Sequence, residues 1–303
     1  MVAEVERHPL EDDEVYVSDL KLFSGGAAAN TAYACGKLGL KSIFIGKLGN
    51  NDTFGSKIIK DFKAVNVDTS MIKYSWEHGT GSAYIVLNKE GERRIYAYSG
   101  AANFLSHDDI KEKELQSTKI IYLSSLRSIE PLIEAARVSQ KHKIPVILNP
   151  GMLIIDQGYS TIKKLLEQID ILILSKREFQ TLFPNDNMSD MKELKKKNIH
   201  IMFDLGIKVV IITMGKAGAF LINKEDSEMI QTIPVKHATD TTGAGDSFSA
   251  GFIYEFIKNP SYLFNDLKKN VKVGNFIAGR CIQKLGARNG LPNSEELISE
   301  FFK

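Results

Sequence analysis

The sequence has two cysteines, one tryptophan and no excess of charge of either sign, and each shortage argues against a class of protein. Cys35 and Cys281 lie far apart and form no CxxC pair, which argues against a disulfide framework and a cysteine zinc site. The 39 basic and 37 acidic residues give a formal net charge of +2, whereas a dedicated nucleic-acid binder has a strong basic excess. We therefore expect no nucleic-acid partner.

Long apolar runs are also missing. No stretch approaches the ~18 residues of a membrane span, and the first residues have neither the basic start nor the apolar core of a signal peptide. Hydrophobic residues make up 43% of the chain and charged residues 25%, which is ordinary globular composition. We expect a cytoplasmic protein without a membrane partner.

The sequence does contain an alternation of apolar strands and helical patterns. Continuous apolar runs predict buried parallel strands at 42–46, 119–123, 145–148, 171–174 and 209–212. Helical patterns are predicted at 30–40, 56–65, 130–141, 160–169 and 246–257. Such alternation is typical of βαβ units and predicts an α/β fold with a doubly wound sheet.

A second kind of strand alternates between polar and apolar residues, which indicates a sheet with one wet face. These strands are predicted at 14–18, 20–22, 82–87 and 94–98, with a hairpin turn over 88–92. Residues 2–24 and 74–100 would together form a small antiparallel β-lid on the core. The lysine run Lys195–Lys197, within 188–198, is interpreted as a solvated helix face.

The strongest motif is the segment from Asp240 to Phe252, where Gly243, Ala244 and Gly245 directly precede a helical pattern. A glycine-rich turn at a helix start exposes backbone N–H groups and the positive end of the helix dipole, which is an anion site suited to phosphate. Asp246 follows at once, and a carboxylate beside bound phosphate suits a base that takes a proton from an attacking hydroxyl. The alternative is an ordinary helix cap, since aspartate favours that position. The loop is not a Walker A motif, because no Gly-Lys-Ser/Thr follows.

A second glycine pair, Gly25-Gly26, precedes a helical pattern of small residues that contains Asn30. A flat Gly-Gly edge lets a polyhydroxylated ligand approach backbone amides, and Asn30 offers both a donor and an acceptor to ligand hydroxyls. A helix cap with tight packing is the alternative interpretation.

Together the two segments closely resemble the two signatures of the ribokinase/PfkB carbohydrate kinase family. That family has Gly-Gly followed by Asn and Ala, and later Asp-Thr-x-Gly-Ala-Gly-Asp-x-Phe. Further family-like pieces lie in the right order over essentially the whole chain, at 46–55, 100–103, 149–150, 213–215 and 286–292. The resemblance implies a single ribokinase-like domain over 1–303, with a Rossmann-type core and a β-lid. It also implies transfer of the γ-phosphoryl group of ATP to an alcohol, with Mg²⁺.

The resemblance also implies roles for individual residues. It makes Asp246 the base, Gly243, Ala244 and Gly245 the anion hole, and Gly25, Gly26 and Asn30 the acceptor edge. Nucleotide contacts would come from Thr213 and Gly215, and from Asn275 in a helix beside the purine pocket. Asp240, Thr242 and the 286–290 loop match the place where many members bind a monovalent cation such as K⁺.

The chain departs from the family pattern at two places. The family carries Asn-x-x-Glu after the strand that matches 171–174, where it serves phosphate and Mg²⁺; here Ser175 replaces the Asn while Glu178 keeps its place. The change affects metal handling at this position, and Lys176 or Arg177 would compensate for it. The family also opens with a buried strand that ends in a substrate-gripping Asp, and the spacing places that Asp at or before Met1. We hypothesise that the natural reading frame starts upstream or that the strand has been lost.

Three other interpretations stay open. The acceptor could be a nucleoside, since Ala27 and Ala28 leave a small apolar wall, and Tyr16, Phe23 and Tyr98 in the lid could stack on a base. A non-catalytic ligand-binding protein on the kinase fold is a second alternative. A dinucleotide-binding oxidoreductase is weaker, because no GxGxxG follows an early strand. We expect a homodimer formed through exposed lid strands.

Overall fold

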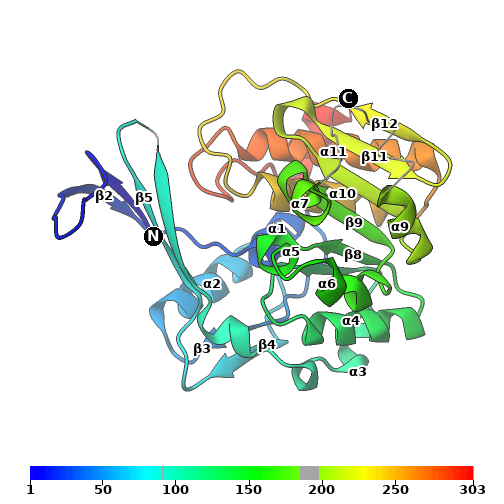
Figure 1. Ribbon diagram of the computed structural model, residues 1–303, viewed down its shortest axis with the longest axis horizontal. Helices are drawn as coiled ribbons and strands as arrows, with labels where there is room; N and C mark the ends of the chain where they lie inside the picture. The colour runs from blue at the N-terminus through cyan, green and yellow to red at the C-terminus, as the bar shows by residue number, and fades with distance from the viewer. Residues whose placement is uncertain (91, 185–197, 303) are drawn as a thin grey trace.

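A six-stranded sheet forms the centre of the molecule in the computed structural model, which describes residues 1–90, 92–184 and 198–302 (Figure 1). The strand order is β12-β11-β10-β9-β8-β7, in which β7 to β10 run parallel and β11 and β12 are antiparallel additions. The strands are β7 (Ile121–Ser124), β8 (Val146–Asn149), β9 (Ile171–Ser175), β10 (Val209–Thr213), β11 (Ala219–Asn223) and β12 (Ser227–Ile230). The parallel strands are continuous apolar runs because helices cover both of their faces.

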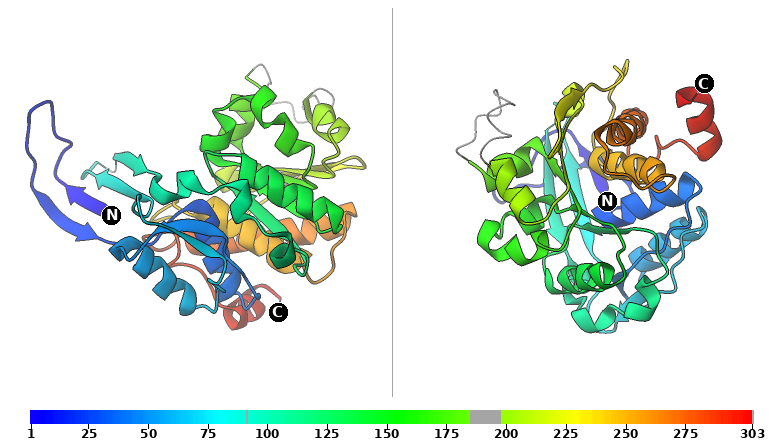
Figure 2. Two further views of the ribbon diagram at one scale, coloured as in Figure 1. Left: turned by 90° about the horizontal axis from the view of Figure 1, so that it is seen from below. Right: turned by 90° about the vertical axis from the view of Figure 1, so that its right-hand side faces the viewer.

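Alternate residues along each strand enter two separate hydrophobic cores. On β9, Leu172 and Leu174 pack toward one set of helices, whereas Ile171 and Ile173 pack toward the other. The first set comprises α4 (Glu130–Lys141), α5 (Gly151–Ile155), α6 (Tyr159–Leu166), α7 (Lys176–Leu182) and α9 (Asn198–Asp204). The second set comprises α1 (Ala27–Lys37), α10 (Ala244–Phe256), α11 (Phe264–Cys281) and α12 (Ser294–Phe301). Figure 2 shows these layers from two further directions. The predicted doubly wound α/β core is confirmed.

Helices α10 and α11 run through the centre of the second layer and approach each other closely. A Cβ on Gly251 of α10 would lie 2.9 Å from the Cα of Gly274 on α11. Only glycine permits this contact, so the pair sets the depth at which α10 lies against the sheet. The start of α10 is held in place by this packing.

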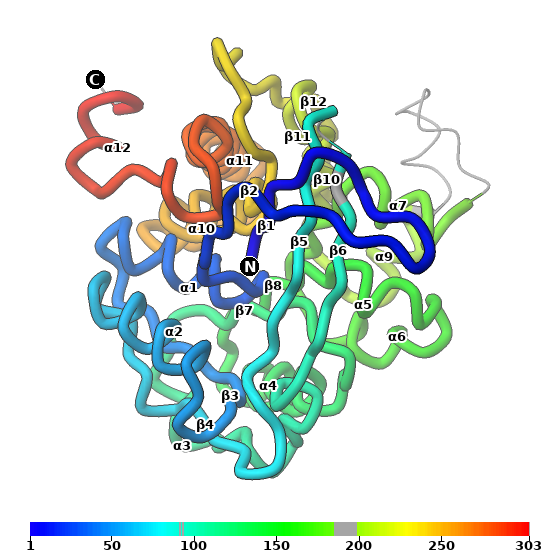
Figure 3. The backbone as a smooth tube through the Cα atoms, turned by 90° about the vertical axis from the view of Figure 1, so that its left-hand side faces the viewer, coloured from blue at the N-terminus to red at the C-terminus, as the bar shows by residue number. Residues whose placement is uncertain are grey.

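A separate four-stranded sheet, the lid, has the order β2-β1-β5-β6 and projects from the core (Figures 1 and 2). Its strands are β1 (Val2–Val5), β2 (Val17–Lys21), β5 (Ser82–Leu87) and β6 (Arg93–Tyr98). Figure 3 looks onto this side, where the lid strands pass in front of the core. The sheet combines two segments distant in sequence, but it is mixed and not purely antiparallel, because β1 runs parallel to β5. The two short strands predicted at 14–18 and 20–22 are one strand, β2.

A third, two-stranded parallel sheet joins β3 (Gly46–Gly49) to β4 (Ile72–Ser75) and packs on α2 (Thr53–Lys63). The buried strand predicted at 42–46 is wrong. Within the described residues, 42–45 forms only an isolated bridge between Ile43 and Asp68, and Ile43 is 39% exposed. The run lines a cavity, and Phe44 and Ile45 also pack against two neighbouring hydrophobic clusters.

Short elements complete the described chain. They are α3 (Glu112–Leu115) and the 3₁₀ turns η1 (Gly100–Phe104), η2 (His107–Asp109) and η3 (Gly215–Ala217). The predicted lysine face at 195–197 lies outside the described residues. Of the helices that the structure describes, none has both the length and the apolar character that a membrane crossing requires.

Candidate active site

The glycine-rich turn lies at the start of α10, as the motif predicts. Gly243 is the N-cap residue and has φ +79°, a left-handed conformation that side chains disfavour. A Cβ there would also lie 2.6 Å from the Cβ of Ala287 and 2.8 Å from its carbonyl oxygen. The turn and the 286–290 loop are therefore packed against each other, and glycine is required at 243 for structural reasons.

Gly245 has a different environment. It is exposed, and a Cβ built on it would meet no described atom within 4 Å. Because it lies in the first turn of a 13-residue helix, its surroundings combine open space with the N–H groups that have no intrahelical acceptor. An open helix start of this kind suits an anionic ligand, because the positive end of the helix dipole favours negative charge.

Asp246 lies one residue further along α10, and its carboxylate points to α1. Its Oδ2 accepts a hydrogen bond of 2.8 Å from Nδ2 of Asn30. Burial raises the pKa of Asp246 to about 6, although the hydrogen bond from Asn30 and the charge of Arg288 both lower it; the charge of Glu178 raises it further. The carboxyl group thus changes charge close to neutral pH, where a general base is most useful.

The acceptor edge predicted from the glycine pair lies at the start of α1. Gly26 is the N-cap residue, with φ +93°, and a Cβ placed on Gly25 beside it would meet no described atom within 4 Å. Asn30 is 5% exposed, and Oγ1 of Thr31 lies 3.2 Å from the backbone oxygen of Ala27 and 3.3 Å from that of Asp246. The structure therefore brings the two predicted motifs together, although 216 residues separate Asn30 from Asp246.

Arg288 completes this group, and the sequence interpretation missed it. Its Nε donates to Oδ1 of Asn30 at 2.9 Å, and the residue is 7% exposed. Its guanidinium carbon lies 4.8 Å from the centre of the Tyr33 ring. The glycines of the 286–290 loop form a visible motif, but an arginine between them has no pattern that marks it as buried.

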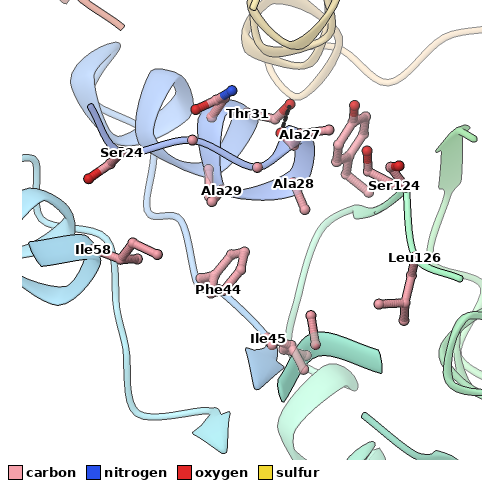
Figure 4. A pocket seen from close by; sticks show the side chains of 18 of the residues that line it. Ser24, Ala27, Ala28, Ala29, Thr31, Phe44, Ile45, Ile58, Ser124 and Leu126 are labelled. Carbon is pink, nitrogen blue, oxygen red and sulfur yellow. Dashed lines mark hydrogen bonds between the residues drawn. The ribbon is translucent and has the colours of Figure 1, made fainter. Parts of the chain in front are cut away.

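A cavity of about 1250 Å³ is lined by the start of α1 and by Asp240 and Thr242, which precede α10; Gly243 to Asp246 are not among its lining residues. Figure 4 looks into it, with Ala27, Ala28 and Ala29 of α1 on one side and the apolar side chains of Phe44 and Ile45 on another. Lid residues also line it, among them Met1, Ile85 and Tyr98. The lid, the acceptor edge and the core thus enclose one space, large enough for a small-molecule ligand.

The same cavity extends along the edge of the central sheet. Residues 120–123 of the β7 segment line it, and so do residues 42–46. In the part of the chain that the structure describes, β7 pairs with β8 alone. The cavity therefore separates the sheet edge from the segment that was expected to be a strand.

Glu178, predicted to serve a metal ion, lies at the carboxyl end of β9. It is 8% exposed, and its Oε2 accepts from the backbone N–H of Ser175 at 2.7 Å. Ser175 in turn accepts from the N–H of Glu178, so the two form a capping box at the start of α7. Lys176 is exposed in the first turn of that helix. Ser175 thus has a structural role as the N-cap residue of α7.

The residues predicted to contact nucleotide follow β10 and lie on α11. Thr213 ends β10, and Gly215 follows it with open space around its Cβ position. Asn275 is 6% exposed, and its Nδ2 donates to the backbone oxygen of Ile230 at 2.9 Å. This bond fixes the end of β12 against α11, so the amide of Asn275 has a structural function as well as its predicted one.

Asp240 and Thr242, predicted to hold a cation, belong to the segment that leads into α10. Asp240 accepts from the N–H of Thr242 and from the N–H of Gly286, both at 2.9 Å. This carboxylate therefore ties the approach to α10 to the 286–290 loop. Within the described residues no group of three or more His, Cys, Asp and Glu side chains is arranged to hold a metal ion.

The α/β fold, the open helix start beside the Asp246 carboxylate and the cavity along α1 are together typical of a phosphotransferase. The chain belongs to the pfkB family of carbohydrate kinases, whose model matches residues 1–294.

Individual relatives agree with this assignment. The chain is 31% identical over 298 residues to a ribokinase of Staphylococcus aureus (strain COL), covering 97% of this chain and 93% of that protein. Among solved structures, it is similar to the Arabidopsis thaliana ribokinase complexed with ribose and ATP, with a TM-score of 0.85, 26% identity and coverage of 98% and 94%. A nucleoside kinase of Methanocaldococcus jannaschii has the same fold, with a TM-score of 0.81, 23% identity and coverage of 98% and 93%.

Proposed function

We propose that this protein transfers the γ-phosphoryl group of ATP to an alcohol group of a sugar or sugar-derived small molecule, with Asp246 as the catalytic base. The observation that carries the proposal is the 2.8 Å hydrogen bond between Asn30 and Asp246. It joins the acceptor edge of α1 to the anion site of α10. An alcohol bound along Gly25, Gly26 and Asn30 would present its hydroxyl to the carboxylate and to the transferred phosphate.

The chemistry follows from this arrangement. Asp246 accepts the hydroxyl proton as the oxygen bonds to the γ-phosphorus, and the bond to the β-phosphate oxygen breaks to release ADP. The N–H groups of Gly243, Ala244 and Gly245 stabilise the negative charge on the phosphoryl oxygens. The lid covers the acceptor, and exclusion of water prevents hydrolysis of ATP in place of transfer.

We assign the magnesium ion of the family to the vicinity of Glu178. Mg²⁺ takes one or two protein carboxylates and completes its shell with phosphate oxygens and water, so a single buried carboxylate fits its needs. When bound, the ion neutralises charge on the nucleotide phosphates. Lys176 supplies a further cation at the start of α7. K⁺ bound by Asp240, Thr242 and the 286–290 loop is part of the same proposal.

A nucleoside acceptor is the second candidate. The alanine wall of α1 and the aromatic side chain of Tyr98 in the lid make part of the cavity apolar, which would suit a base as well as a sugar. The nucleoside kinase among the solved structures of this fold adds weight to that alternative. We also propose that the enzyme is a cytoplasmic homodimer paired through the lid, where Tyr84, Ile95 and Tyr96 are all at least 50% exposed.

An acceptor screen tests the proposal. Purified protein is incubated with ATP, Mg²⁺ and K⁺ and with pentoses, hexoses, sugar acids, sugar phosphates, inositols or nucleosides, and ADP and the phosphorylated product are both measured. We expect stoichiometric product with one class of acceptor and none from Asp246→Asn. Nucleotide binding without turnover on any class would favour the non-catalytic alternative.

A further inference from the structure

Arg288 lies where three separated parts of the chain meet beneath the candidate site. Its Nε donates to Oδ1 of Asn30 on α1, and its Nη2 lies 3.5 Å from the carbonyl oxygen of Gly25. Its Nη1 lies 4.0 Å from Oδ2 of Asp61 on α2. The side chain is 7% exposed, and Nη1 has no hydrogen-bond partner within the described residues. Burial of the Arg288 charge costs free energy because the guanidinium loses its hydration, so its position calls for a structural or functional explanation.

The contact with Asn30 determines which way the Asn30 amide faces. An arginine is a donor at every nitrogen and accepts nothing, so the atom of Asn30 that meets it must be the oxygen. The amide nitrogen of Asn30 then necessarily faces the other way, toward Oδ2 of Asp246, to which it donates at 2.8 Å. The reversed amide would set donor against donor at Arg288 and oxygen against carboxylate at Asp246.

We propose that Arg288 is a positioning residue for phosphoryl transfer, which acts through Asn30 to orient the Asp246 carboxylate and to keep it ionised. This inference rests on the proposed function for the role of Asp246 as the base. It adds a residue from the far end of the chain that contacts Asn30, Gly25 and Tyr33 in the structure. Burial of Arg288 lowers the stability of the fold. In return, the Asp246 carboxylate is held in one orientation and is ready to accept a proton.

The charges around Asp246 define what Arg288 contributes. Burial lowers the pKa of Arg288 to about 10, so the guanidinium is cationic at neutral pH. The Asp246 carboxylate interacts electrostatically with titratable groups from several elements. They are Arg288, Glu178 of α7, Tyr122 of β7 and Cys281 of α11. Arg288 is the only cation in this set. Glu178 opposes it by raising the pKa of Asp246, so loss of Arg288 leaves the carboxylate beside a like charge.

A direct titration of Asp246 tests the inference without using activity. The full chain is labelled with ¹³C at aspartate carboxyl groups, and the Asp246 signal is assigned by its absence in Asp246→Asn. We expect Arg288→Met to raise the pKa of Asp246 by about one pH unit, because a cation that favours the charged form has been removed. Arg288→Lys keeps the charge and should leave the pKa of Asp246 close to its wild-type value. Arg288→Gln keeps one donor without the charge and should give an intermediate value.

Kinetics provide the second readout. With the acceptor found in the screen, kcat/KM of Arg288→Met should fall about fivefold more at pH 6 than at pH 8, since the base is ionised at the higher pH in both proteins. The matched control is Arg280→Met. Arg280 lies on the surface near the end of α11 and pairs with Glu300 of α12. It should leave both the Asp246 titration and the pH profile unchanged. Thermal unfolding of each variant establishes that it is folded, and Arg288→Gln replaces Arg288→Met if the latter is not.

The outcomes separate this inference from the proposed function. An unchanged Asp246 titration in folded Arg288→Met and Arg288→Gln would overturn the role of Arg288, whatever the activity. A loss of activity that is equal at every pH, with the titration unmoved, would assign Arg288 a purely structural role. A shifted titration together with full activity in Asp246→Asn would uphold the coupling but overturn Asp246 as the base.

Discussion

At the start of α10 the candidate site is built from backbone, whereas along the cavity it is built from side chains that come from many segments. The phosphate end consists of consecutive residues, with Gly243 held by Ala287 and Gly245 open. The acceptor end combines α1, the lid, residues 42–46 and the end of β7. The contrast teaches that the glycine turn is encoded locally, while the cavity and the contacts of Asp246 depend on distant parts of the chain.

The sharpest way to test the phosphate end is to compare two glycines in one turn. We expect Gly245→Ala to lower kcat/KM on the order of 10²-fold, because the new methyl group occupies space that the phosphate needs. Its fold should be unharmed, since alanine favours the helix by roughly 0.5–1 kcal/mol over glycine. Steady-state kinetics and thermal unfolding on the same preparation give both quantities.

The matched change, Gly243→Ala, should act on stability first. Its positive φ and its contact with Ala287 predict a loss of about 1–3 kcal/mol in the free energy of unfolding. If Gly245→Ala kept full activity, or if the two variants were destabilised alike, the open space at Gly245 would not be the phosphate site.

At the acceptor end, a larger side chain at Ala28 should narrow the cavity. We expect Ala28→Leu to raise the KM for the acceptor about tenfold, with kcat and the KM for ATP little changed, because pocket contacts of this size are worth about 1–3 kcal/mol. Ala64→Leu, at the exposed end of α2, is the control. An equal effect on the KM for ATP would mean that Ala28 does not belong to the acceptor side.

The smallest effect concerns the sheet edge beside the cavity. β9 is hydrogen-bonded on both sides, whereas within the described residues β7 is bonded only to β8. Amides of 121–124 should therefore exchange with deuterium faster than those of 171–175, on the order of tenfold or more. Native-state hydrogen exchange followed by mass spectrometry measures both peptides at once. Equal protection would show that the cavity does not weaken this edge.

The sequence predicted the core and the glycine turn of the phosphate end well, and for a physical reason. Buried parallel strands such as β9 and β10 are continuous apolar runs, and a glycine turn before a helix is a local pattern. Such features depend on neighbours in the chain and leave a readable periodicity. The prediction of Asp246 as the base came from the same local reasoning.

Prediction was weaker where neighbours come from far away. Residues 42–46 look like a buried strand, but what lies beside them depends on the cavity and not on their own composition. The parallel pairing of β1 with β5 joins segments more than 80 residues apart, and nothing in either strand specifies that direction. Arg288 was missed because its burial depends on Tyr33 and Asn30, which precede it by more than 250 residues.

The pH dependence of turnover tests the central claim most directly. Because a base must be ionised to accept a proton, and because burial raises the pKa of Asp246 to about 6, kcat/KM should rise with pH and level off above that value. In Asp246→Asn, kcat/KM at the plateau should fall about 10²- to 10⁴-fold, and the rise with pH should disappear. If Asp246→Asn showed the same rise with pH, or kept wild-type turnover, the account would be contradicted. Another group would then accept the hydroxyl proton.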